Sequence, residues 1–128
     1  MLTLSSSFNS IIARTCAPVL LYHSVFETIP KDLRQGIHNV TPGILREQVS
    51  WLKKNFEIVP VDELLMAPKP GQCSITFDDA YVSVFENAAP ILLDLKVPFT
   101  VFINGVTLNG GILWRDKIRY LINNDLVN

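Results

Sequence analysis

Ser74-Ile75-Thr76-Phe77-Asp78-Asp79-Ala80-Tyr81 is the stretch that decides the fold we expect for this chain. Its first half is apolar and β-branched, as in a buried strand, and it ends at two adjacent acids. Ligands of α/β proteins bind at the carboxyl ends of strands, so Asp78 and Asp79 are candidates for chemistry. Their mutual repulsion would be relieved by a bound cation. The same pair is also typical of a plain turn or a helix N-cap, because Asp accepts hydrogen bonds from free backbone N–H groups.

Strands and helices alternate on both sides of this stretch. We predict strands at residues 19–22, 58–61, 74–77 and 99–103. A helix should begin at Thr41-Pro42, and a short helical turn should follow Asp62. Two further helices are predicted, one at 87–96 and a last one with an apolar stripe. The stripes of the first and last helices are Leu45, Val49, Leu52 and Phe56, and Trp114, Ile118, Leu121 and Ile122. This alternation predicts an α/β fold with a parallel sheet.

Composition fits one small domain. The chain has 128 residues, 48% of them hydrophobic, and a formal charge of -1, which gives no electrostatic footprint for nucleic acid. Its two cysteines are too few for a disulfide framework. We expect residues 1–17 to form a loose N-terminal arm and 18–128 the domain. The sequence predicts neither a signal peptide nor a transmembrane segment, so a cytoplasmic location is the default expectation.

A wider set of residues resembles one enzyme family. Thr76-Phe77-Asp78-Asp79, the strand ending at Tyr22-His23, Val40-Thr41-Pro42 and the segment from Val97 to Phe102 stand in the order of a known pattern. They resemble the N-terminal portion of the polysaccharide deacetylase family, the NodB-homology enzymes of carbohydrate esterase family 4. The resemblance runs from about Pro18 to about Leu121. It implies a distorted TIM-like (β/α) barrel, of which this chain would supply the first half.

The resemblance also implies a reaction. Enzymes of this family remove N-acetyl, or sometimes O-acetyl, groups from polysaccharides and use one divalent metal, usually zinc. By position, Asp78 would be the general base and Asp79 a metal ligand. His23 and Tyr81 would contact the substrate. His38 receives no role.

The sequence departs from the family pattern in several places. The His-Ser/Thr-x-x-His motif, which supplies the other two metal ligands, is absent, and His23 and His38 are the chain's two histidines. Ala80 replaces the usual Gly, a mild change unless the position needs positive φ. We therefore expect a chain truncated before that motif, with an incomplete metal site and no activity on its own. A half-barrel would also expose apolar surface and favour self-association.

Two other hypotheses remain open at this point. In the first, the chain is a non-catalytic remnant or a glycan-binding, partner-dependent half-barrel, and the missing histidines favour this hypothesis. Alternatively, it is a phosphotransfer domain of the receiver type, in which acids at a strand end bind magnesium. The position of the acids, after the third strand, argues against the second of these.

Overall fold

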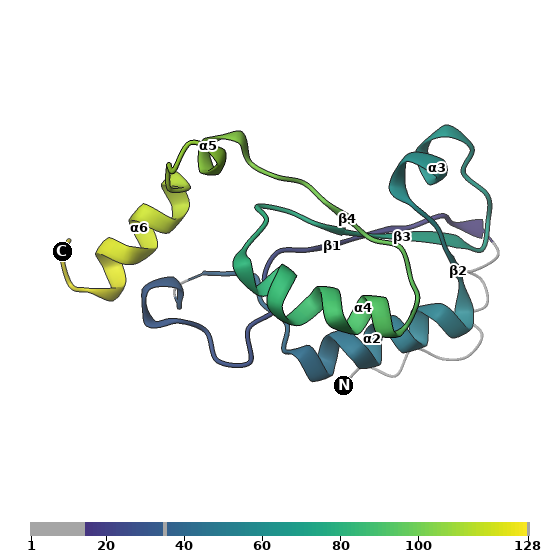
Figure 1. Cartoon of the computed structure of the whole chain (residues 1–128), viewed down its shortest axis with the longest axis horizontal. Helices are drawn as coiled ribbons and strands as arrows, with labels where there is room; N and C mark the ends of the chain where they lie inside the picture. The colour runs from purple at the N-terminus through teal and green to yellow at the C-terminus, as the bar shows by residue number, and fades with distance from the viewer. Residues whose placement is uncertain (1–14, 35, 128) are drawn as a thin grey trace.

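Four parallel strands form the sheet of the computed structural model, which describes residues 15–34 and 36–127 (Figure 1). They are β1 (Val19–Tyr22), β2 (Glu57–Ile58), β3 (Gln72–Phe77) and β4 (Thr100–Val101). β1 pairs with β3 along its whole length, with Tyr22 opposite Phe77. The other edge of β3 pairs with β2 at its start and β4 at its end. The prediction of an α/β fold with a parallel sheet is therefore confirmed. The predicted N-terminal arm lies largely outside the described residues.

Helices and helical turns lie between these strands and after the last one. The elements are a 3₁₀ turn η1 (Lys31–Leu33), α2 (Pro42–Asn55), α3 (Val61–Met66), a π-helical turn η2 (Val84–Ala88), α4 (Ala89–Asp94), α5 (Gly105–Leu108) and α6 (Trp114–Asn123). α2 begins where predicted, because the Thr41 side chain caps it by accepting a hydrogen bond from the Ile44 N–H at 3.3 Å. No helix of the described part is long and apolar enough to cross a bilayer.

Three predicted boundaries were wrong. The strand expected at 58–61 is limited to β2, because α3 already starts at Val61, directly after Pro60. The strand expected at 99–103 is limited to β4. The helix expected at 87–96 is preceded by η2, in which the Ala89 N–H bonds to the Val84 carbonyl. Pro90 has no N–H for a regular i→i−4 bond, which accounts for a widened turn at this place.

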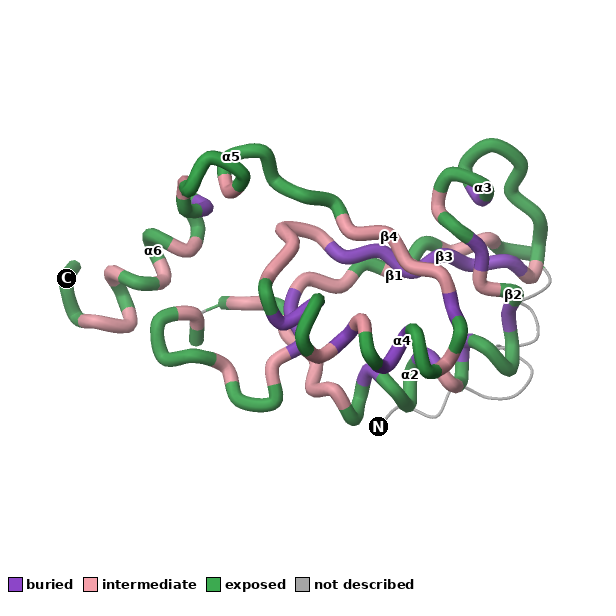
Figure 2. Tube along the Cα trace, viewed as in Figure 1, coloured by how far each residue is buried: buried purple, intermediate pink, exposed green. Residues whose placement is uncertain are grey.

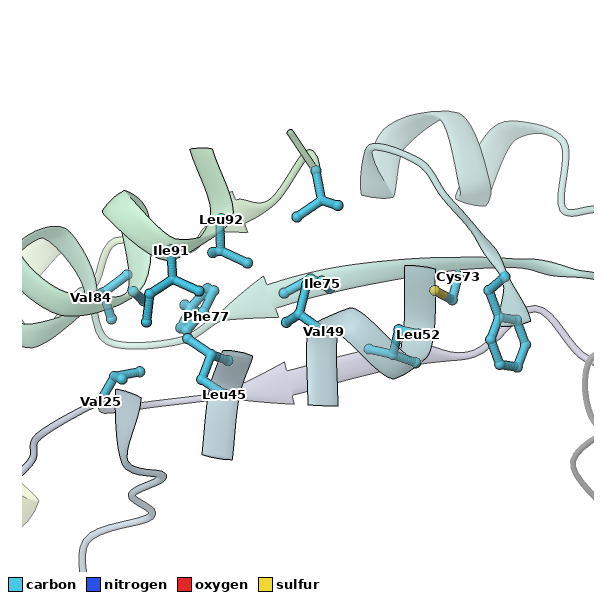
Figure 3. Packing of buried hydrophobic residues seen from close by; sticks show 13 residues of the cluster. Val25, Leu45, Val49, Leu52, Cys73, Ile75, Phe77, Val84, Ile91 and Leu92 are labelled. Carbon is cyan, nitrogen blue, oxygen red and sulfur yellow. The ribbon is translucent and has the colours of Figure 1, made fainter. Parts of the chain in front are cut away.

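The hydrophobic core lies between one face of the sheet and the helices α2 and α4 (Figures 1 and 3). Cys73, Ile75 and Phe77 of β3 point into it and are almost fully buried. The Phe77 ring contacts the rings of Tyr22 and Phe99, at centroid distances of 5.4 and 6.1 Å. The predicted stripe of α2 and two residues of α4 pack against them: Leu45, Val49, Leu52, Phe56, Ile91 and Leu92. Each large side chain buried here contributes about 1.5–3 kcal/mol, which fixes β3 and the acids that follow it.

The opposite face of the sheet is partly open. Ser74 and Thr76 are buried there, and their hydroxyls donate to the carbonyls of Val59 (2.8 Å) and Leu20 (2.9 Å). Their neighbours in β1, Val19 and Leu21, are 46% and 54% exposed. On this face, within the described part, apolar side chains of β1 therefore remain in contact with solvent.

α5 and α6 extend away from the sheet (Figures 1 and 2). The last helix forms where predicted, but none of its residues is buried in the described part of the structure. Trp114, the first residue of its apolar stripe, is 72% exposed. The helix makes polar contacts at both ends: Arg115 and Asp116 reach Asp79 and Tyr81 after β3, and the Asn123 and Asn124 side chains donate to Asp32 of η1.

Candidate active site

The two acids lie at the carboxyl end of the central strand, as predicted. The Asp78 N–H donates to the Tyr22 carbonyl at 2.9 Å and continues the pairing of β1 with β3 by one residue. The chain then turns sharply, with φ values of 66° at Asp79 and 51° at Ala80. This left-handed turn ends the strand and places both acids at the end of the sheet.

The left-handed conformation makes Ala80 an unfavourable residue at its position. The sequence indicated a mild replacement of Gly unless the position needed positive φ, and the structure has positive φ there. Asp tolerates this region because its short side chain makes local hydrogen bonds, whereas a left-handed Ala costs about 1–2 kcal/mol. The turn that carries the acids is therefore strained at Ala80.

The environments of the two carboxylates differ. The Asp79 Oδ2 lies 3.1 Å from the Arg115 Nη2, and only 9% of the Asp79 side chain is exposed. The guanidinium thus supplies the positive charge that adjacent acids require. The Asp78 carboxylate, in contrast, has neither an ion pair nor a hydrogen bond to any residue that the structure describes. It is half-buried and available to a substrate or a water molecule.

Tyr81 joins the site to α6. Its hydroxyl donates to the Asp116 Oδ1 at 2.9 Å, and Arg119 pairs with the same oxygen at 2.5 Å. Arg119 also donates to the Gly36 carbonyl at 2.9 Å, which ties in the loop before α2. Burial, and then the hydrogen bond to Asp116, raises the pKa of Tyr81 to about 12, so the hydroxyl keeps its proton.

The sequence missed the residues of α6 that reach this site. The family resemblance predicts that Tyr81 contacts substrate, and this role stays a prediction; in the structure its hydroxyl donates to the Asp116 carboxylate. The sequence indicates no role for Arg115 or Asp116. The spacing of Asp116 and Arg119 is that of an i,i+3 pair, but nothing in the sequence indicates a partner 35 residues upstream.

His23 and His38 come together although they lie on different segments. His23 follows β1 and is half-buried, whereas His38 is exposed in the loop before α2. Their ring centroids are 5.2 Å apart, beside a hollow of about 510 Å³. The sequence predicted a substrate contact for His23 and no role for His38. The first stays a prediction, and the structure adds His38 as its neighbour.

The described residues do not form a complete metal site. Among them, no group of three or more His, Cys, Asp and Glu side chains could hold an ion. A catalytic zinc normally needs three protein ligands, and here Asp79 has Arg115 as its partner. The residues present therefore do not by themselves fit the metal that the family resemblance implies.

Comparisons of sequence point to one family. Residues 66–122 match the family model described as polysaccharide deacetylase. Over 72 residues the chain is 33% identical to the poly-beta-1,6-N-acetyl-D-glucosamine N-deacetylase of Staphylococcus aureus. The match covers 52% of this chain and 25% of that protein.

Solved structures agree on the fold. The Streptococcus pyogenes deacetylase in complex with acetate superposes with a TM-score of 0.62 at 20% identity, covering 79% of this chain and 50% of that one. A polysaccharide deacetylase from Bacillus cereus gives a TM-score of 0.56 at 25% identity, covering 68% and 29%. The chain thus spans half or less of the length of each of these relatives.

Proposed function

Since this chain is a relative of the polysaccharide deacetylases and matches their family over residues 66–122, we propose that it carries the N-terminal portion of a domain that deacetylates a polysaccharide. The observation that carries this proposal is the pair of acids held at the carboxyl end of β3, within the matched segment. An N-acetylated glycan is the substrate class that we infer, because the S. aureus relative is named for such a substrate.

The unequal surroundings of the acids support a division of labour. Asp78 is the general base in this proposal, because its carboxylate has no partner within the described part and is available to take a proton from water. Asp79 is the more enclosed of the two, and a metal ion would take the place of the Arg115 guanidinium that now neutralises it. We assign it as a ligand of a divalent metal, with zinc as the expected ion. Because no three acid, Cys or His side chains of the described part group around an ion, at least one further protein ligand would have to come from outside those residues.

The open face of the sheet supports a half-barrel. Val19 and Leu21 line that face, and β1 has β3 as its one strand partner in the described part. In a closed parallel barrel, side chains of further strands fill the space above such a face. We therefore propose that these residues become interior when the barrel is complete, and that the 128 residues alone release no acetate.

A chimera tests this function. In the chimera, residues 66–122 of this chain replace the matching segment of the S. aureus deacetylase. The other segments of the S. aureus protein then surround Asp78 and Asp79. We expect a folded chimera to release acetate from a β-1,6-linked N-acetylglucosamine oligomer, and to lose this activity with a chelator. A folded chimera that binds the oligomer but releases no acetate would overturn the proposal.

Glycan binding without chemistry is the second candidate. The observation in its favour is the ion pair of Asp79 with Arg115, which uses the carboxylate that a metal would need. This candidate predicts that the 128-residue chain binds the same oligomer, and that Arg115→Ala in the chimera restores no acetate release. Titration calorimetry with the oligomer measures the first outcome directly.

A further inference from the structure

The two histidines of this chain form a pair apart from the two acids, and substrate contact by His23 is the one role predicted for either of them. His23 follows directly after β1, and His38 belongs to the segment that returns to α2. Fifteen positions separate them in the sequence, yet their ring centroids are 5.2 Å apart with a tilt of 39° between the planes. The backbones of the two segments must therefore lie next to each other at this point.

A small hydrogen-bonded bridge provides that support. Ser24 and Asn39 pair as an isolated parallel bridge, in which the Ser24 N–H donates to the His38 carbonyl at 3.2 Å and the Val40 N–H to the Ser24 carbonyl at 3.2 Å. The residues before this pair are the two histidines. Because side chains alternate along extended segments, both imidazoles emerge on the side opposite to Ser24 and Asn39.

Side chains reinforce the bridge from its other side. Ser24 is 1% exposed, and its hydroxyl donates to the Asn39 Oδ1 at 2.9 Å. The same oxygen accepts from the Phe26 N–H at 2.7 Å, and the Asn39 amide returns a hydrogen bond to the Phe26 carbonyl at 3.0 Å. The backbone that carries the two histidines is therefore fixed by hydrogen bonds before a ligand binds, which lowers the entropic cost of binding.

The separation of the rings suits a shared metal ion. With Zn–N bonds of about 2.0–2.1 Å and tetrahedral angles, two imidazoles on one ion have ring centres about 5 Å apart. Neutral imidazole is a good ligand for Zn²⁺, Ni²⁺ and Cu²⁺. Beside the pair lies the hollow of about 510 Å³, whose lining includes Tyr22 and Val40 and leaves room for further ligands.

We propose that His23 and His38 bind one divalent transition-metal ion as a two-imidazole site that does not include Asp79. No third His, Cys, Asp or Glu of the described residues completes a protein-only site there, so water or an oxygen of a bound molecule fills the remaining positions. The proposal does not depend on deacetylase activity. It gives His38 a role as a metal ligand, whereas the sequence indicated no role for this residue.

The test uses the full 128-residue chain without a histidine tag, in a Cys16→Ser background that removes the exposed thiol. Zn²⁺ is titrated while NMR follows the imidazole C–H signals, of which the chain has two sets because it has two histidines. We expect saturation at one equivalent, with both sets shifting together. His38→Gln, at an exposed position, should weaken binding at least ten-fold, and His23→Gln should do the same.

Asp79→Asn serves as the discriminating variant, and the proposal expects its affinity for Zn²⁺ to equal that of the parent. Loss of binding in this variant would place the ion at the acids and overturn the two-histidine site. A shift of one imidazole only, or unchanged affinity in His38→Gln with native circular dichroism, would overturn it as well.

Discussion

Replacing Ala80 by Gly should stabilise the protein, although Gly usually destabilises ordered backbone. Ala80 has φ 51° in the turn that follows the two acids. Relief of the left-handed conformation is worth about 1–2 kcal/mol. Gly also gives the unfolded chain more freedom, which offsets about 0.4–1 kcal/mol of that gain. The expected net effect of Ala80→Gly is therefore an increase in the free energy of unfolding of about 0–1.6 kcal/mol, with a centre of about 0.8 kcal/mol.

Urea denaturation measures this change as a higher midpoint at an unchanged m-value. Ala67→Gly is the matched control, because Ala67 is exposed and its φ of -150° lies outside the left-handed region. That control should lower the free energy of unfolding by about 0.4–1 kcal/mol, since only the unfolded chain gains from it. If Ala80→Gly destabilises the protein as much as Ala67→Gly does, the reasoning about the strained turn is wrong.

Three further predictions concern the rest of the described chain. Cys16 is exposed and Cys73 is buried, with a pKa raised by burial to about 11, so a thiol reagent at pH 8 should label one thiol in the native state and two in urea. Because the pKa of Tyr81 is raised, its contribution to stability is complete below pH 10 and is lost as the pH approaches 12. The free energy of unfolding, measured by urea denaturation between these pH values, should therefore fall less in Tyr81→Phe than in the parent. An equal fall in the two proteins would contradict this. The chain should self-associate with increasing concentration in sedimentation velocity, and Leu21→Lys on the open sheet face should reduce this; a parent that stays monomeric would contradict it.

The sequence predicted the parts of the fold that depend on local patterns. The stripe of α2 and the Thr41 cap follow from helical periodicity and capping chemistry, and both are found. The strand before the acids was recognisable because its residues are apolar or β-branched. Predicted boundaries failed beside prolines: α3 starts directly after Pro60, and the helical segment that contains Pro90 begins before residue 87 and includes the turn η2.

The candidate site was predictable only in part, because its contacts are not local. Asp78 and Asp79 were found from their place after a strand. The pairing of Asp79 with Arg115 joins residues 36 positions apart, and the sequence holds no signal for it. The same holds for His38, whose position beside His23 depends on the bridge between Ser24 and Asn39. Such contacts require the course of the loops, which periodicity does not give.

Asp78 carries the central claim, and acetate release by the chimera with and without Asp78→Asn tests it most directly. A general base contributes about 10²–10⁴-fold to the rate, so the substitution should lower kcat by at least about 100-fold while the oligomer still binds. Asp94→Asn, on an exposed acid of α4, is the matched control and should leave the rate unchanged. Unchanged acetate release by Asp78→Asn would contradict the role of Asp78 as the base of a deacetylase site.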